Sequence, residues 1–228
     1  MKQTAVVIAP GRGTYNKTEL GYLAQRHPDK AELFAQFDRY RQDRGQVPVT
    51  ELDGQYRYSI STHTRGDNAS PLIYACAYPD FLSIDRDAYD IVGVTGNSMG
   101  WYIALACAGA LNPMAGLEVV NTMGTLMQEQ LIGGQIIYPY TDNNWVEIPG
   151  QKQKLLDLCQ KISARPDHFL ALSIDLGGLL VLAGDTNGLT AFEQAVEPVQ
   201  DRFPMRLQNH AGFHSTLQIP VAEMVVND

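Results

Sequence analysis

The segment from Tyr89 to Ala110 constrains the fold of this 228-residue chain more than any other. The apolar run Ile91-Val92-Gly93-Val94 leads into the turn Gly96-Asn97-Ser98-Met99-Gly100, and an alanine-rich stretch follows from Trp101. This order predicts a strand, a tight turn and a helix. A strand that passes directly into a helix is typical of the α/β class.

The turn has the pattern Gly96-x-Ser98-x-Gly100, which is typical of a nucleophile elbow. The two glycines relieve crowding at a strained turn, so that the Ser98 hydroxyl projects at the N-terminus of the helix. The backbone N–H of Met99 would then point to the place where an oxyanion forms. Because so short a pattern also occurs by chance, it is the strand-turn-helix context that favours a catalytic Ser98 over a plain tight turn.

A serine hydroxyl needs a base at neutral pH, and the chain offers five histidines for that role. We expect His27, before a surface helix, and His168, in a charged turn, to be exposed to solvent, whereas His63 lies in an uninformative segment. His210 and His214 directly follow the last predicted strand, where the chain is expected to return to the elbow. We therefore predict that His214 is the base.

Composition narrows the classes of function. The chain has 17 Lys plus Arg against 25 Asp plus Glu, a net charge of −8, so we expect no nucleic-acid partner. The three cysteines lack CxxC spacing and have apolar neighbours, which predicts buried thiols in a reducing compartment and no metal site. The apolar run after Met1 is too short for a signal peptide or a membrane span, which predicts a cytoplasmic protein without a membrane partner.

Other elements follow from periodicity and from Gly and Pro signals. Residues 4 to 9 predict a buried strand that stops at Pro10-Gly11-Arg12-Gly13, with a helix to follow. Residues 46 to 67 are poorly informative and fit strands, a hairpin or an irregular excursion. Further helices are predicted over residues 28 to 44, 70 to 82 (with Ser70-Pro71 as cap and first turn) and 114 to 131.

The chain changes texture after Gly133-Gly134. Strands and helices are predicted in the order β-α-β-β-α-β, which is typical of a split βαβ, or ferredoxin-like, motif. The fold class that we predict is therefore an α/β-hydrolase-like body, residues 1–132 plus 209–228, with an inserted ferredoxin-like subdomain, residues 133–208. The predicted elements of the insert are a strand at 135–139, a helix at 151–163, strands at 169–174 and 179–183, a helix at 189–199 and a strand at 205–209.

Four motifs occur in a fixed order along residues 4 to 220. They are Pro10-Gly11-Arg12-Gly13, Gly96-Asn97-Ser98-Met99-Gly100-Trp101, Gly124-Thr125-Leu126-Met127-Gln128 and Gly212-Phe213-His214-Ser215. In order, spacing and insertion, the sequence resembles the malonyl-CoA:ACP transacylase family, which includes the acyltransferase domains of fatty-acid and polyketide synthases.

The resemblance implies a mechanism. Ser98 would attack the thioester of an acyl-CoA while His214 takes its proton, and the acyl-serine would pass its acyl group to the phosphopantetheine thiol of an acyl carrier protein. The backbone N–H groups of Arg12 and Met99 would form the oxyanion hole. Acyl-CoA and the carrier thiol are thus expected as substrates, the carrier protein as partner, and no permanently bound cofactor.

The resemblance also places Arg12, Met123, Gln128 and Phe213 at the substrate. Arg12 stands where the family has glutamine, so it adds a cation. Met123 stands where malonyl-specific members carry an arginine that pairs with the free carboxylate. Because stranding a buried carboxylate costs several kcal/mol, Met123 puts malonyl selectivity in doubt and suits an acyl chain without a distal charge. Ordinary helix packing of Met123, and Arg12 as a substitute cation, stay as alternatives.

Family members continue past the histidine motif with a further strand and helix. This chain ends 14 residues after His214. It is therefore expected to be either a naturally shortened member or a fragment.

Two other functions remain open. An acyl-thioester hydrolase would use the same site with water as acceptor, and Ser98, Asp185 and His214 follow the chain order of an α/β-hydrolase triad. A catalytically impaired homologue would only bind the carrier protein. Carrier proteins are acidic, and the segment from 151 to 165 offers basic residues against Asp157 alone; they are Lys152, Lys154, Lys161 and Arg165.

Overall fold

The computed structural model describes residues 2–227, which fall into two compact units. The first unit ends at Leu126 and the second begins at Met127, within one long helix, α7 (Pro113–Gln130). Each unit has a hydrophobic core of its own. The fold is a mixed α/β fold, as the sequence predicts, whereas the predicted domain boundaries at residues 132 and 209 stay a prediction.

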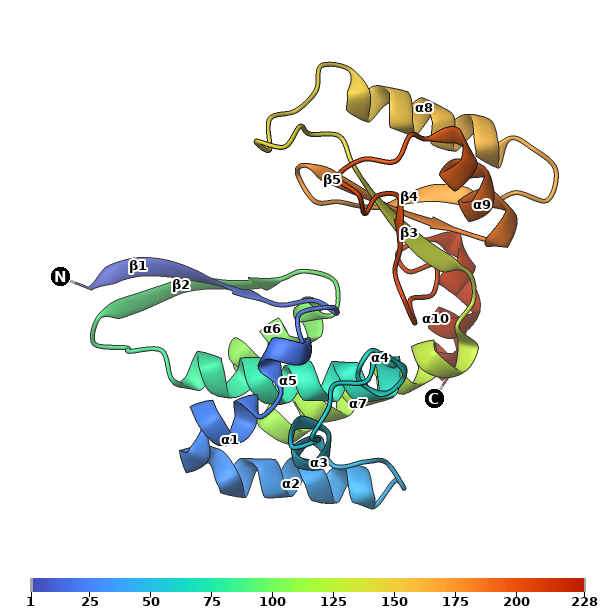
Figure 1. Ribbon diagram of the computed structural model, residues 1–228. Helices are drawn as coiled ribbons and strands as arrows, with labels where there is room; N and C mark the ends of the chain where they lie inside the picture. Colours follow the sequence, from blue (N-terminus) through green and yellow to red (C-terminus); the bar gives the residue numbers. More distant parts are fainter. Residues whose placement is uncertain (1, 228) are drawn as a thin grey trace. The chain divides into compact units, whose positions relative to one another are not determined.

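The first unit combines a parallel pair of strands with a group of helices (Figure 1). Strands β1 (Gln3–Ala9) and β2 (Tyr89–Gly96) pair in parallel, and Ala9 lies opposite Gly96. The paired strand ends therefore bring the two glycine-containing turns together. The remaining helices of this unit are α1 (Tyr22–Arg26), α2 (Ala31–Gln42), α3 (Val49–Asp53), α4 (Ile60–His63), α5 (Gly66–Leu82) and α6 (Gly100–Cys107).

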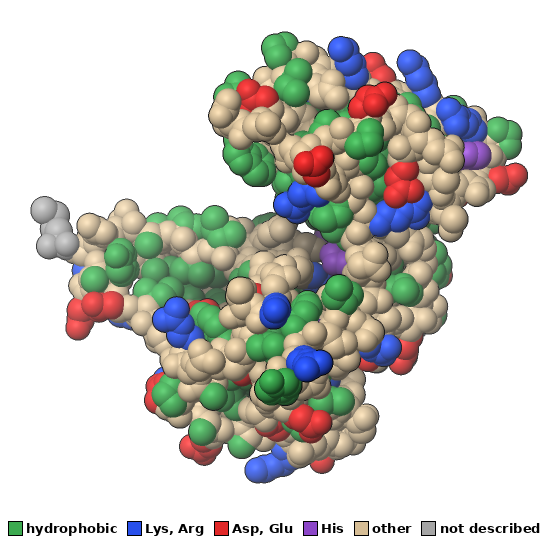
Figure 2. All heavy atoms as spheres, viewed as in Figure 1, with side chains coloured by type: hydrophobic (Ala, Val, Ile, Leu, Met, Phe, Trp, Pro, Cys, Tyr) green, Lys and Arg blue, Asp and Glu red, His purple; other side chains and the backbone are tan. Residues whose placement is uncertain are grey.

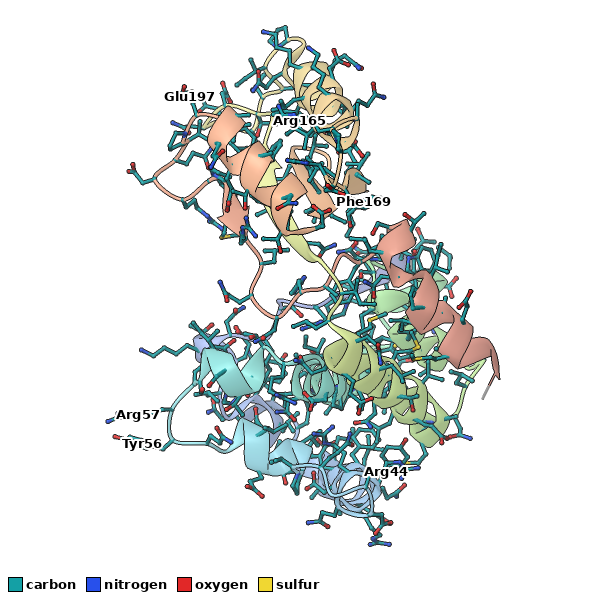
Figure 3. All side chains as sticks on the ribbon, turned by 90° about the vertical axis from the view of Figure 1, so that its right-hand side faces the viewer. Arg44, Tyr56, Arg57, Arg165, Phe169 and Glu197 are labelled. Atoms are coloured by element: carbon teal, nitrogen blue, oxygen red, sulfur yellow. The ribbon has the colours of Figure 1, made fainter. Side chains whose placement is uncertain are left out.

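Several expectations for this unit need correction. The uninformative segment forms the short helices α3 and α4, with Tyr56 and Arg57 on the loop between them (Figure 3). His27 is buried, with only 4% of its surface exposed to solvent, and its Nε2 lies 2.8 Å from Asp80 Oδ1 on α5. The partner Asp80 lies 53 residues from His27 in the chain, so the local sequence around His27 does not reveal it.

Helix α5 begins at Gly66, four residues before the predicted cap, and contains Pro71. Proline has no N–H, so the carbonyl of Asp67, four residues earlier, loses its helical donor. Arg41 Nη1 donates to this carbonyl at 2.8 Å. A buried arginine from α2 thus supplies the hydrogen bond that the proline removes.

The second unit contains a four-stranded antiparallel sheet in the order β4-β5-β3-β6. Strands β3, β4 and β5 are labelled in Figure 1. The predicted element order β-α-β-β-α-β is confirmed, and α8 has the same bounds as the predicted helix. Helices α8 and α9 contact each other, and each also contacts strands of the sheet. The elements are β3 (Gly134–Pro139), α8 (Gln151–Ser163), β4 (Leu170–Asp175), β5 (Leu179–Gly184), α9 (Thr186–Ala195), β6 (Met205–Arg206) and α10 (Ile219–Asn227).

The three cysteines form no disulfide. Cys76, Cys107 and Cys159 are free thiols, and burial raises the pKa of Cys107 and of Cys159 to about 11. They are therefore protonated at neutral pH.

Residues 2–227 contain no group of three metal-ligating side chains, and none of their helices combines the length and apolar character that crossing a bilayer requires.

Candidate active site

The turn between β2 and α6 holds Ser98 in a left-handed backbone conformation, with φ of +53°. A side chain at Gly96 would place its Cβ 2.1 Å from the carbonyl carbon of Gly100, and one at Gly100 would lie 2.2 Å from the Ala9 oxygen. Both positions therefore require glycine. The turn is closed by Gly100 N–H, which donates to Asn97 O at 2.8 Å. This is the geometry expected of a nucleophile elbow.

The loop after β1 contacts the elbow directly. A Cβ at Gly11 would lie 2.7 Å from Asn97 O, and Asn97 N–H donates to Ala9 O at 3.1 Å. The backbone of this loop therefore lies against the turn that carries Ser98. Met99, whose N–H is the other predicted oxyanion donor, is buried at the start of α6.

Arg12 is anchored at the C-terminal end of α4. Its Nη2 donates to Thr64 O at 2.7 Å, and burial lowers the pKa of Arg12 to about 10, although Asp67 opposes this shift. Arg12 is therefore still a cation at neutral pH. Asp67 itself forms a bidentate pair with Arg65, with distances of 3.0 and 2.8 Å.

Met123 lies half-buried on α7. The next residue, Gly124, allows α7 to approach α5, because a Cβ there would lie 2.4 Å from Gly66 O and 2.8 Å from Ser70 Oγ. Gly124, the neighbour of Met123, thus packs against Gly66 and Ser70, while Arg12 donates to the nearby Thr64 carbonyl. These contacts could not be read from the sequence, where the segments are far apart.

His214 lies in the second unit. Like Ser98, it has a left-handed backbone conformation, with φ of +54°. Gly212 N–H donates to Ile132 O at 2.8 Å, and Ser215 Oγ donates to Gly212 O at 2.6 Å. Hydrogen bonds on both sides therefore hold the turn. Desolvation lowers the pKa of His214, which favours the neutral imidazole that a general base requires.

The second unit also contains polar residues that the sequence analysis missed. Gln135 and Ser173 both lie within hydrogen-bond distance of the Phe213 carbonyl oxygen, which directly precedes His214. The available signal was one glutamine in the otherwise apolar strand β3. Phe213 is buried, and its ring centroid lies 5.6 Å from that of His210.

Asp185, the acid of the alternative triad, caps α9. Its Oδ1 accepts from Gly188 N–H at 2.7 Å and its Oδ2 accepts from Phe169 N–H at 2.9 Å. This carboxylate therefore has a structural role at a helix N-terminus. His63 likewise has a structural role, because only 1% of its surface is exposed to solvent and its Nε2 lies 3.1 Å from Leu52 O.

The predicted site residues divide between the units. Arg12, Ser98, Met99 and Met123 belong to the first unit, whereas Phe213 and His214 belong to the second. Gln128 follows on the same helix as Met123, just beyond the boundary. The pairing of Ser98 with His214 stays a prediction.

Comparison with known proteins agrees with this fold. No protein-family model and no curated protein matches the sequence. Among solved structures, the chain is similar to the malonyl-CoA:acyl carrier protein transacylase of Xanthomonas oryzae, with 19% identity and a TM-score of 0.76 over 100% of this chain and 69% of the other. It is also similar to the malonyl-CoA:ACP transacylase of Synechocystis, with 21% identity and a TM-score of 0.73 over 99% and 68%.

A third solved structure contains a partner. It is a type II polyketide synthase acyl-carrier protein in complex with its malonyl-transacylase, with 19% identity and a TM-score of 0.76 over 99% of this chain and 69% of the other. At these identities the likeness concerns the fold. The chain has the fold of malonyl-CoA:ACP transacylases and spans about two thirds of the length of these solved chains.

Proposed function

We propose that this chain, which has the fold of the malonyl-CoA:ACP transacylases, is an acyltransferase that uses Ser98 as nucleophile and an acyl carrier protein as acceptor. The observation that carries the proposal is the strained Ser98 turn between β2 and α6, against which the backbone of the Arg12 loop lies. Strain of this kind costs roughly 1–2 kcal/mol and concentrates at functional sites.

In the proposed reaction, Ser98 Oγ attacks the carbonyl carbon of an acyl-CoA while neutral His214 takes the hydroxyl proton. The oxyanion is stabilised by the backbone N–H groups of Arg12 and Met99. The C–S bond then breaks, coenzyme A leaves as a thiol with the proton from His214, and the acyl group stays on Ser98. The phosphopantetheine thiol of the carrier protein reverses these steps and carries the acyl group away. No resident cofactor takes part.

We propose further that the acyl group lacks a distal carboxylate. Met123 lies next to Gly124, which packs closely on Gly66, and a thioether cannot neutralise a carboxylate. The Arg12 guanidinium already donates to Thr64 O, which ties it to the backbone of the first unit.

The antiparallel strand order of the second unit supports a ferredoxin-like subdomain inserted into an α/β-hydrolase-like body. Its helix α8 is a candidate docking surface for an acidic carrier protein, and Lys and Arg side chains recur along it (Figure 2). Lys154 and Lys161 are exposed, as is Arg165 just beyond the helix (Figure 3), whereas Lys152 pairs with Asp175. We also propose a cytoplasmic location, as the sequence predicts.

The proposal is tested by incubating the protein with acetyl-CoA, malonyl-CoA and longer acyl-CoAs and measuring intact mass. We expect an acyl adduct from the uncharged donors, no adduct in Ser98→Ala, and faster malonyl loading in Met123→Arg. Equal malonyl and acetyl loading by the wild-type protein would contradict the role of Met123. Absence of every adduct would overturn the acyltransferase proposal and favour a homologue that only binds the carrier.

A further inference from the structure

Gln135 is an unusual residue at its position. It lies on β3 among apolar neighbours, and only 3% of its surface is exposed to solvent. Burying an amide is unfavourable unless its oxygen and its nitrogen both find hydrogen-bond partners. On the neighbouring strand it is paired with Ala183, whose side chain is small. A buried glutamine therefore needs an explanation beyond packing.

The amide of Gln135 links three segments of the second unit. Its Oε1 lies 2.9 Å from His210 Nδ1, and its Nε2 donates to Ser173 Oγ at 2.7 Å. Ser173 Oγ in turn donates to Phe213 O at 2.9 Å, and Gln135 Nε2 is 3.4 Å from the same oxygen. Because Gln135 Oε1 can only accept, His210 must carry its proton on Nδ1. The hydrogen bonds therefore have one direction, from His210 to the Phe213 carbonyl.

The end point of this chain is the peptide group that joins Phe213 to His214. A peptide group is planar, so fixing its oxygen also fixes the direction in which the chain enters His214. His214 has φ of +54°, a left-handed conformation that a residue with a Cβ rarely keeps unless its surroundings hold it there. The hydrogen bonds of Ser173 and Gln135 oppose relaxation from this conformation.

We propose that Gln135 and Ser173 are positioning residues that hold the Phe213 carbonyl and thereby orient the His214 imidazole. This inference rests on the proposed function, because it assigns the orientation to a base acting on Ser98. It adds two residues, Gln135 from β3 and Ser173 from β4, that act through the backbone next to His214.

The test compares three variants in pre-steady-state acylation of Ser98. Gln135→Met keeps the length of the side chain without its polar atoms, Gln135→Glu keeps the acceptor for His210 but removes the amide donor, and Ser173→Ala removes the hydroxyl. We expect each to lower the acylation rate on the order of 10- to 100-fold at an unchanged KM for acyl-CoA, because small displacements of a catalytic group have effects of this size.

Thr141→Val is the matched control. Thr141 is also buried in the second unit, and its Oγ1 donates to Gly178 O at 3.4 Å. This variant also removes a buried hydrogen bond of the second unit, and it should keep the wild-type acylation rate. The double variant of Gln135→Met with Ser173→Ala should be no slower than the worse single variant, because both act on one carbonyl.

A second readout does not depend on activity. The imidazole NMR signals of His214 should shift in Gln135→Met and in Ser173→Ala but not in Thr141→Val. Folded variants with unshifted His214 signals, or with acylation rates within twofold of wild type, would overturn the positioning role. If wild-type protein forms no acyl adduct while the His214 signals shift as expected, the proposed function fails and the positioning of His214 stands.

Discussion

At the scale of single residues, Ser98 and His214 both have a left-handed backbone conformation, and different contacts hold each of them in it. Ser98 is held by close backbone packing around Gly96 and Gly100, whereas His214 is held by hydrogen bonds from distant strands. The first situation is predictable from sequence because the glycines are adjacent in the chain. The second is not, because Gln135 and Ser173 lie 78 and 40 residues from Phe213.

The lowered pKa of His214 predicts the pH dependence of acylation. Its cause is desolvation, which disfavours the charged form, so the imidazole loses its proton below the ordinary pKa of 6.5. As the pH rises through this lowered pKa, the base becomes neutral and the acylation rate should increase to a plateau that is reached at neutral pH. The measurement is the burst of coenzyme A release at a series of pH values. A midpoint above 6.5 would contradict the assignment of His214.

At the scale of elements, α5 shows how tertiary contacts override local signals. Proline in a helix interior is normally costly, so the sequence predicts a start at Ser70-Pro71. The helix instead begins at Gly66, since Arg41 satisfies the carbonyl that Pro71 leaves without a donor. Arg41 also binds Asn68, Asn121 and the Val47 carbonyl, and thereby connects α2 with α5 and α7.

Arg41→Met should destabilise the first unit by about 2–4 kcal/mol, since each buried acceptor left without its donor costs about 1–3 kcal/mol. Arg41 is fully buried, and burial lowers its pKa to about 10, so it stays charged at neutral pH. Arg39→Met makes the same change on an exposed position of α2 and should have an effect within about 0.5 kcal/mol. Urea unfolding monitored by circular dichroism compares the two. Equal midpoints would show that the Arg41 hydrogen bonds contribute little.

At the scale of the whole molecule, long periodic segments were predictable and short ones were not. Helix α8 has the predicted bounds and α7 differs from its prediction by one residue at each end, because both carry a clear apolar periodicity. Helices α3 and α4 have only five and four residues, too few for a period to show. Helix α9 begins three residues before its prediction, at the Asp185 cap that the sequence analysis weighed only as a catalytic acid.

The molecule as a whole carries a net charge of −8, so the proposed docking of an acidic carrier protein requires a local basic surface, for which α8 is the candidate. Transfer of the acyl group to that carrier is the step that separates the proposed acyltransferase from a hydrolase. The experiment isolates the acyl-Ser98 protein and follows its mass after adding either phosphopantetheine-bearing acyl carrier protein or buffer. We expect the acyl group to leave Ser98 more than about 10-fold faster with the carrier and to appear as a thioester on its phosphopantetheine. Loss of the acyl group to water at the same rate in both samples would contradict transfer to the carrier and identify a hydrolase.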